Sequence, residues 1–203
     1  MNESVKKTME SLENNGFKAA YFDDSDSAVK YLMESIKNEA TVGIGGSMTV
    51  KSLEIPEKLI ERGSTVYFHW LESTPEGMDK AREKAAKADV YLASTNALTE
   101  GGQLVNIDGC GNRVASMIFG PKKVYILCGV NKITKNLDEA LKRIKDNAYK
   151  NARRLKLKTP CAITEKCADC RSPQRMCSVT TIIERRPYKT DFEVIIIGQE
   201  LGY

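Results

Sequence analysis

The chain has little histidine and little tryptophan, with one of each among its 203 residues, His69 and Trp70. A catalytic triad that includes histidine would have to use His69, and nothing near it in the sequence supplies its partner. No apolar run approaches the roughly 20 residues of a membrane-spanning helix. Residues 1–20 also lack the apolar core of a secretion signal. These absences predict a protein with no membrane segment and a cytoplasmic location.

The chain also lacks a strong excess of either charge, because its formal net charge is only +4. That value is too small to indicate a nucleic-acid partner unless basic residues gather in one patch. Hydrophobic residues make up 41% of the sequence, which is enough for a packed core. We therefore expect a single domain over residues 1–203, with residues 158–203 as an appendage to it.

Short apolar segments alternate with amphipathic ones along the first 157 residues. Predicted strands at 17–22, 41–44, 65–70, 90–93 and 123–128 are separated by predicted helices at 5–15, 27–37, 53–62, 76–87 and 113–119, and a long helix follows at 137–157. This alternation is typical of a mainly parallel sheet covered by helices on both faces. The fold class that we expect is α/β.

The segment from Ser94 to Arg113 is rich in glycine and short polar side chains. Gly101-Gly102 favours a tight turn, so that the residues after it fold back as a strand of a β-hairpin. A second glycine-rich turn then leads into a helix, where free backbone N–H groups suit an anion. The alternative is a polar hairpin that only connects two elements. We favour a ligand site, because the segment follows a strand end.

Another glycine-rich segment occurs earlier in the chain, as GIGGSMTV at residues 43–50, where it joins a predicted strand to a helix. Such turns can hold a phosphate or carboxylate on backbone N–H groups. The turn matches neither the Walker motif nor the dinucleotide-binding motif, and on its own it is more simply a tight turn that needs small residues.

Three predicted strands end in polar residues, after Ile44, after Ala93 and after Cys128. Because ligands of parallel sheets bind beyond the carboxyl ends of the strands, we expect these polar residues to converge. Arg113 is the best counter-charge for a carboxylate or phosphate, and Glu100 is the candidate base or nucleophile. The predicted ligand-binding residues are Gly45, Gly46, Ser47, Thr49, Thr95, Asn96, Gly101, Gly102, Asn106, Asn112 and Arg113.

Four of the six cysteines are close together, as Cys161, Cys167, Cys170 and Cys177 in the pattern C-x5-C-x2-C-x6-C. Four thiolates repel one another unless they are protonated, paired or bound to a metal. The pattern favours an iron–sulfur cluster, most simply [4Fe–4S], over zinc. Disulfides are the alternative, but a reducing compartment disfavours them. The isolated Cys110 and Cys128 are interpreted as incidental.

Two β-rich runs follow the cysteines, at 180–184 and 192–197. We expect them to form a C-terminal β-hairpin that either extends the sheet or provides a contact in a homodimer.

The motifs GIGGSMTV, TNALTEGGQLVNIDGCGNRVA and GPKKVYILCGVNKI together resemble the LUD domain of lactate-utilisation proteins. The tail PCAITEKCADCRSPQRMC is similar to a subgroup of that family. The resemblance implies a three-layer α/β/α Rossmann-like fold like that of the sugar-isomerase and CoA-transferase group. It also implies a small anionic metabolite as ligand, iron–sulfur partner proteins, and a role in oxidising lactate or a similar hydroxyacid.

Two other interpretations remain open. The chain is then either a non-catalytic regulatory or scaffold domain with a structural metal site, or a sugar-phosphate isomerase or transferase. The first is favoured by the absence of a convincing acid–base pair. The second requires a carboxylate–lysine arrangement that the sequence does not make evident.

Overall fold

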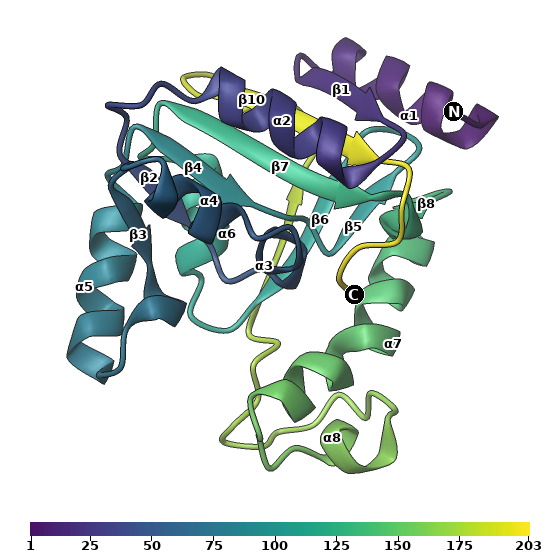
Figure 1. Ribbon diagram of the computed structural model, residues 1–203. Helices are drawn as coiled ribbons and strands as arrows, with labels where there is room; N and C mark the ends of the chain where they lie inside the picture. The colour runs from purple at the N-terminus through teal and green to yellow at the C-terminus, as the bar shows by residue number, and fades with distance from the viewer.

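The computed structural model describes residues 1–203 and contains two sheets (Figure 1). The larger sheet has six strands in the order β1-β10-β7-β4-β2-β3, and every neighbouring pair is parallel. Its strands are β1 (Lys18–Phe22), β2 (Val42–Ile44), β3 (Val66–Phe68), β4 (Val90–Ala93), β7 (Lys123–Gly129) and β10 (Asp191–Ile197). The parallel order confirms the predicted α/β fold class.

One face of this sheet is covered by α2 (Ser25–Ser35), α3 (Met48–Ser52) and α4 (Ile55–Glu61) (Figure 1). Apolar side chains of these helices form one continuous core with the strands, and Leu32, Ile44, Leu59 and Leu127 are among its fully buried members. Burial of such side chains supplies most of the driving force for folding.

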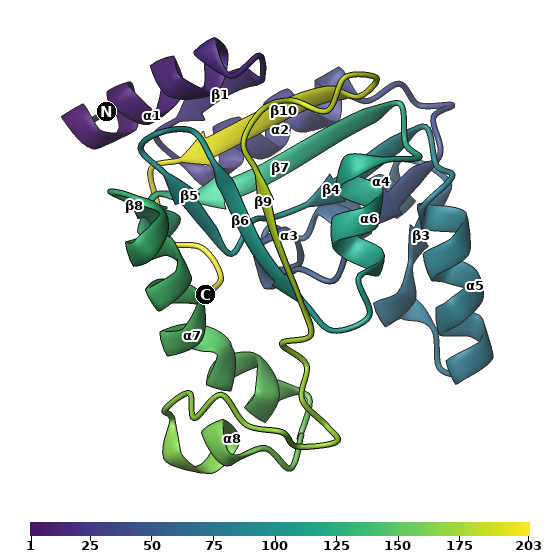
Figure 2. The same cartoon turned by 180° about the vertical axis from the view of Figure 1, so that it is seen from behind.

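The opposite face is covered by α1 (Glu3–Asn14), α5 (Pro75–Ala85), α6 (Asn112–Ile118) and a second sheet (Figure 2). That sheet has the order β8-β5-β6-β9 and consists of β5 (Ala97–Thr99), β6 (Leu104–Asp108), β8 (Ile133–Thr134) and β9 (Val179–Ile183). Its Leu98 and Leu104 face the main sheet, whereas Ala97 and Val105 pack against α7 (Leu137–Arg154). The β5–β6 pair is the hairpin predicted around Gly101-Gly102.

The helix predicted at residues 53–62 starts later in the structure, at Ile55, and a separate short helix, α3, precedes it. α3 ends at Ser52, and α4 begins only at Ile55, after Glu54 takes a left-handed φ of 53°. Pro56 at the start of α4 has no backbone N–H to continue the hydrogen bonds of α3. The chain therefore turns between two short helices, and Gly43–Val50 ends in a helix of its own.

The predicted C-terminal β-hairpin is wrong. β9 pairs with β6 in the small sheet, and β10 lies between β1 and β7 in the large one. The residues of β10 from Phe192 to Ile197 are all buried, as expected for a parallel strand covered on both faces. Since β10 is an interior strand of the sheet, paired on both sides, residues 158–203 are not an appendage. The segment between α7 and β9, which contains α8 (Pro160–Thr164), projects from the body together with the end of α7 (Figures 1 and 2).

None of the helices has the length and apolar character needed to cross a membrane.

Candidate functional site

Residues that follow three adjacent strands of the large sheet are joined by hydrogen bonds to the amino group of Lys132. This residue follows β7 in the short 3₁₀ helix η2 (Val130–Lys132). Its Nζ donates hydrogen bonds to Thr49 Oγ1, beyond β2, at 2.7 Å and to Ser94 Oγ, beyond β4, at 2.8 Å. The order β7-β4-β2 makes these three strand ends neighbours. The predicted convergence of polar residues at this edge is confirmed.

Lys132 is 3% exposed and has no carboxylate within ion-pair distance. The pKa of its amino group is lowered to about 8, chiefly by burial and to a smaller extent by the nearby cations Arg143 and Arg113, against an opposing influence of Cys128. The hydroxyls of Thr49 and Ser94 orient the nitrogen without neutralising a charge on it. A buried amine held this way is both a binding group for an anion and a potential nucleophile.

Lys132 lies in a cavity of about 610 Å³, a volume typical of small-molecule sites. Six cationic side chains line this cavity, whereas Asp108 is its one carboxylate. Asp108 is already engaged, because its Oδ2 lies 3.6 Å from Nε of Arg113. The cavity therefore carries an excess of positive charge and favours an anionic ligand.

An aromatic pair forms another wall of the cavity. His69 and Trp70 lie in η1 (His69–Leu71), directly after β3, with ring centroids 5.9 Å apart. Burial lowers the pKa of His69 to about 4, with smaller contributions from Arg82 and Arg154. The imidazole is therefore neutral at physiological pH. The guanidinium of Arg154 stacks on Trp70 at 4.6 Å from the ring centroid.

Arg82 supplies an unused hydrogen-bond donor in this wall. Its Nη1 pairs with Asp79 at 2.6 Å, but its buried Nε has no partner. Buried polar groups are normally satisfied, so an unpaired donor on a cavity wall is a candidate contact for a ligand.

Arg113 does not have the free guanidinium expected of a ligand counter-charge. Its Nη1 donates to Ser94 O at 2.8 Å and to Asn106 Oδ1 at 2.9 Å. Its Nη2 donates to Asn96 Oδ1 at 2.8 Å and to Ile107 O at 2.9 Å, and Nε faces Asp108. All five donors are directed at protein atoms, so Arg113 holds the β4–β5 connection and the end of β6 together.

The predicted catalytic residue, Glu100, lies outside the cavity. It is at the tip of the β5–β6 hairpin, where it accepts hydrogen bonds from Ser4 Oγ at 2.7 Å and from Lys7 Nζ at 3.0 Å, both on α1. These contacts lower its pKa, chiefly through the bond from Ser4. Gly101 and Gly102, two of the predicted ligand residues, lie in the same turn and do not line the cavity. Gly101 O accepts a hydrogen bond from Asn15 Nδ2 at 2.9 Å, and a Cβ on Gly102, at φ 77°, would come within 2.9 Å of Leu12 N. This turn anchors α1 to the small sheet.

The other predicted ligand residues divide into two groups. Gly46, Ser47, Thr49, Thr95, Asn96, Asn112 and Arg113 line the cavity. Gly45 and Asn106 lie behind it, where a Cβ on Gly45 would come within 2.9 Å of Arg113 Cγ and the Asn106 amide supports Arg113.

Sequence reasoning missed Lys132, His69, Arg82 and Arg143. The polar end of β7 was the one available signal for Lys132.

The cysteine-rich segment forms part of the cavity wall, through Arg175, Met176 and Cys177. Arg175 donates to the carbonyls of Cys170 at 2.7 Å and Cys177 at 2.9 Å, which brings two turns of the segment together. Burial raises the pKa of the Cys177 thiol, and the thiols of Cys167, Cys161 and Cys170 are near enough to raise it further. All six cysteines are free thiols. No three cysteine, histidine or acidic residues are arranged as metal ligands.

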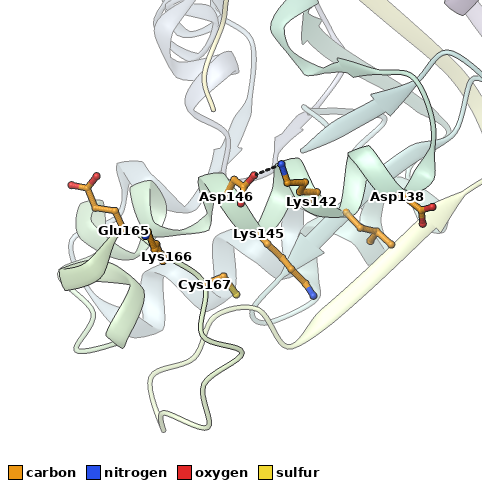
Figure 3. Close-up of a pocket in the computed structure, with 8 residues that line it drawn as sticks. Asp138, Lys142, Lys145, Asp146, Glu165, Lys166 and Cys167 are labelled. Atoms are coloured by element: carbon orange, nitrogen blue, oxygen red, sulfur yellow. Dashed lines mark ion pairs between the residues drawn. The ribbon is translucent and has the colours of Figure 1, made fainter.

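An open hollow on the other side of this segment lies beside Cys167 (Figure 3). Its walls alternate Lys142, Lys145 and Lys166 with acidic residues, and Lys142 Nζ lies 3.9 Å from Asp146 Oδ2. The opposite charges compensate each other, and the lining contains no buried reactive group. The hollow therefore has fewer features of a ligand-binding site than the cavity around Lys132 has.

Comparisons with known proteins match the chain to the family described as the LUD domain, over residues 5–197. Among solved structures, the crystal structure of a DUF162 family protein from Deinococcus radiodurans is similar in fold, with a TM-score of 0.56 at 10% sequence identity over 96% of each chain. No curated protein shows significant similarity to the chain.

Proposed function

The chain belongs to the LUD-domain family, which implies a function related to lactate utilisation, and from that premise we propose that it binds a small anionic metabolite in the cavity around Lys132. We propose further that it is a cytoplasmic subunit of a redox system that oxidises lactate or a similar hydroxyacid.

The observation that carries the proposal is the buried Lys132 in a cavity with an excess of cationic side chains. A buried ammonium group without a carboxylate partner is costly, and an anionic ligand would offset that cost. Arg82 supports the proposal, because its unpaired Nε offers a further donor to the same ligand. The His69–Trp70 pair provides an apolar surface for the uncharged part of the metabolite.

The cysteines are the proposed link to electron transfer. Cys161, Cys167, Cys170 and Cys177 would hold a [4Fe–4S] cluster, with a single zinc ion as the alternative. Four thiols on one short segment suit either group, and neighbouring lysine and arginine side chains offset their charge. An iron–sulfur centre at this wall of the cavity would supply one-electron transfer to or from a partner protein. A homodimer is compatible with this role.

A second candidate function is a regulatory or scaffold domain in which the cavity binds an effector. Two observations favour it. Glu100 lies outside the cavity, and Asp108 is paired with Arg113, so neither carboxylate is free to act as a base beside the ligand. Turnover of lactate by the single chain would exclude this function, whereas turnover only with added iron–sulfur partners would support the subunit role.

Calorimetry with lactate, pyruvate and inorganic phosphate tests the anion site. We expect Lys132→Met to abolish binding, because it removes the central positive charge while keeping a side chain of similar length. Lys142→Met is the matched control, since Lys142 lies in the open hollow. Equal binding by wild type and Lys132→Met would refute the proposed site.

A further inference from the structure

We propose that Lys132 is a reactive amine, and that its Nζ forms an imine with an anionic carbonyl compound bound in the cavity. This inference rests on the proposed anion site and specifies which class of anion that site takes.

The first argument is the placement of Nζ. It is held by two hydroxyls from different strand ends, Thr49 Oγ1 and Ser94 Oγ, which fix its direction. Thr49 Oγ1 lies 3.3 Å from Leu201 O and Ser94 Oγ lies 3.3 Å from Thr95 O, so each hydroxyl has a carbonyl to which it donates. Both hydroxyl oxygens are thereby oriented to accept from Nζ. An oriented amine loses little freedom when it reacts.

The second argument is the set of charged groups around the amine. Arg113 from α6 and Arg143 from α7 act on it as cations, and the Cys128 thiol, on β7 just before it in the chain, has the opposite influence. From α3 and the β4–β5 connection it meets only uncharged hydroxyls. Desolvation and neighbouring cations are the two conditions that make a lysine nucleophilic. The lowered pKa of Lys132 agrees with this placement.

The reaction is balanced without any oxidant or reductant. The lone pair of neutral Nζ forms a C–N bond to the carbonyl carbon, and the C=O π electrons move to oxygen. One proton passes from nitrogen to this oxygen, which gives a carbinolamine. The hydroxyl then leaves with the second nitrogen proton as water, and the C=N bond remains. The overall change is amine plus carbonyl compound to imine plus water.

The surrounding cations select the carbonyl compound. Positive charge on the cavity walls favours a carboxylate or a phosphate attached to the carbonyl carbon skeleton. A 2-oxo acid and a phosphorylated ketone share this chemistry. Pyruvate and dihydroxyacetone phosphate are therefore suitable probes, one for each anionic group.

Borohydride trapping tests the inference on the full chain. Borohydride reduces an imine to a stable secondary amine, so intact-mass measurement should show one reduced adduct per chain with at least one of the two probes. Peptide mapping of wild-type protein should place the adduct on Lys132, which requires no variant. Lys132→Met should lose the adduct, whereas Lys142→Met should retain it.

The outcomes separate this inference from the proposed function. Binding of pyruvate and phosphate by calorimetry without any trapped adduct would overturn the imine and leave the anion site standing. Equal labelling of many surface lysines would also overturn it. Absence of binding by every anion would overturn the proposed function together with the imine. One adduct on Lys132, suppressed by inorganic phosphate, would support both.

Discussion

Replacing Arg113 with alanine should destabilise the fold by about 4 kcal/mol. The change removes all five guanidinium donors, so that Asp108, Asn106 and Asn96 lose their contacts with Arg113 and keep only bonds from backbone N–H groups. It also leaves two backbone carbonyls, those of Ser94 and Ile107, without their donors.

The magnitude follows from the burial of this network. Arg113 is 8% exposed, and its ion pair with Asp108 is similarly shielded from water. Removing one partner of a buried ion pair typically costs about 3–5 kcal/mol, and an orphaned buried acceptor costs about 1–3 kcal/mol. Partial access of water to the new space reduces the sum, which gives the value of about 4 kcal/mol. Arg113→Lys keeps the charge but lacks the planar fork, and we expect it to cost more than about 2 kcal/mol.

Urea denaturation followed by circular dichroism measures the change. With a slope of about 2 kcal/mol/M, the midpoint of Arg113→Ala should fall by about 2 M. Arg154→Ala is the matched control, because Arg154 lies in the same cavity and its hydrogen bonds are to Asn151 on its own helix. Its midpoint should change little. A loss below about 1 kcal/mol for Arg113→Ala, together with lost anion binding, would refute this structural role and restore the ligand-binding one.

The remaining predictions concern titration, the cysteines and the hairpin tip. Acylation of Lys132 should accelerate as pH rises through about 8, because its amine loses a proton there rather than near the usual value of about 10.4; a midpoint near 10 would contradict the lowered pKa. The single histidine, His69, should show no NMR titration between about pH 6 and 8, since its pKa is about 4. An unfolded histidine takes up its proton near pH 6.5, so the stability contributed by neutral His69 should be complete above that pH and fall as pH drops towards 4. Anaerobic iron, sulfide and zinc analysis should find metal in reconstituted wild type and much less in Cys167→Ser and Cys170→Ser; sub-stoichiometric metal in the wild type would contradict the metal proposal. Glu100→Gln should leave anion binding unchanged, because Glu100 contacts α1, and a large loss of affinity would place it at the ligand after all.

Much of the fold could be predicted from local pattern. Apolar segments alternating with amphipathic ones indicated a parallel sheet with helices on both faces, and Gly101-Gly102 indicated the β5–β6 hairpin. These features follow from spacing along the chain, because side-chain periodicity and turn chemistry act over a few residues. The same reasoning located three polar strand ends, although it could not rank their residues.

The partners of these residues were decided only by the tertiary structure. Lys132 meets Thr49 and Ser94 across 83 and 38 residues of sequence, because β7, β4 and β2 are neighbours in the sheet. The sequence predicted Arg113 as a free counter-charge for a ligand, whereas in the structure its guanidinium is directed at five protein acceptors. The two apolar C-terminal runs looked like a hairpin, yet β9 and β10 joined different sheets. Long-range strand pairing sets burial and hydrogen-bond partners, and local sequence patterns carry little information about which strands pair.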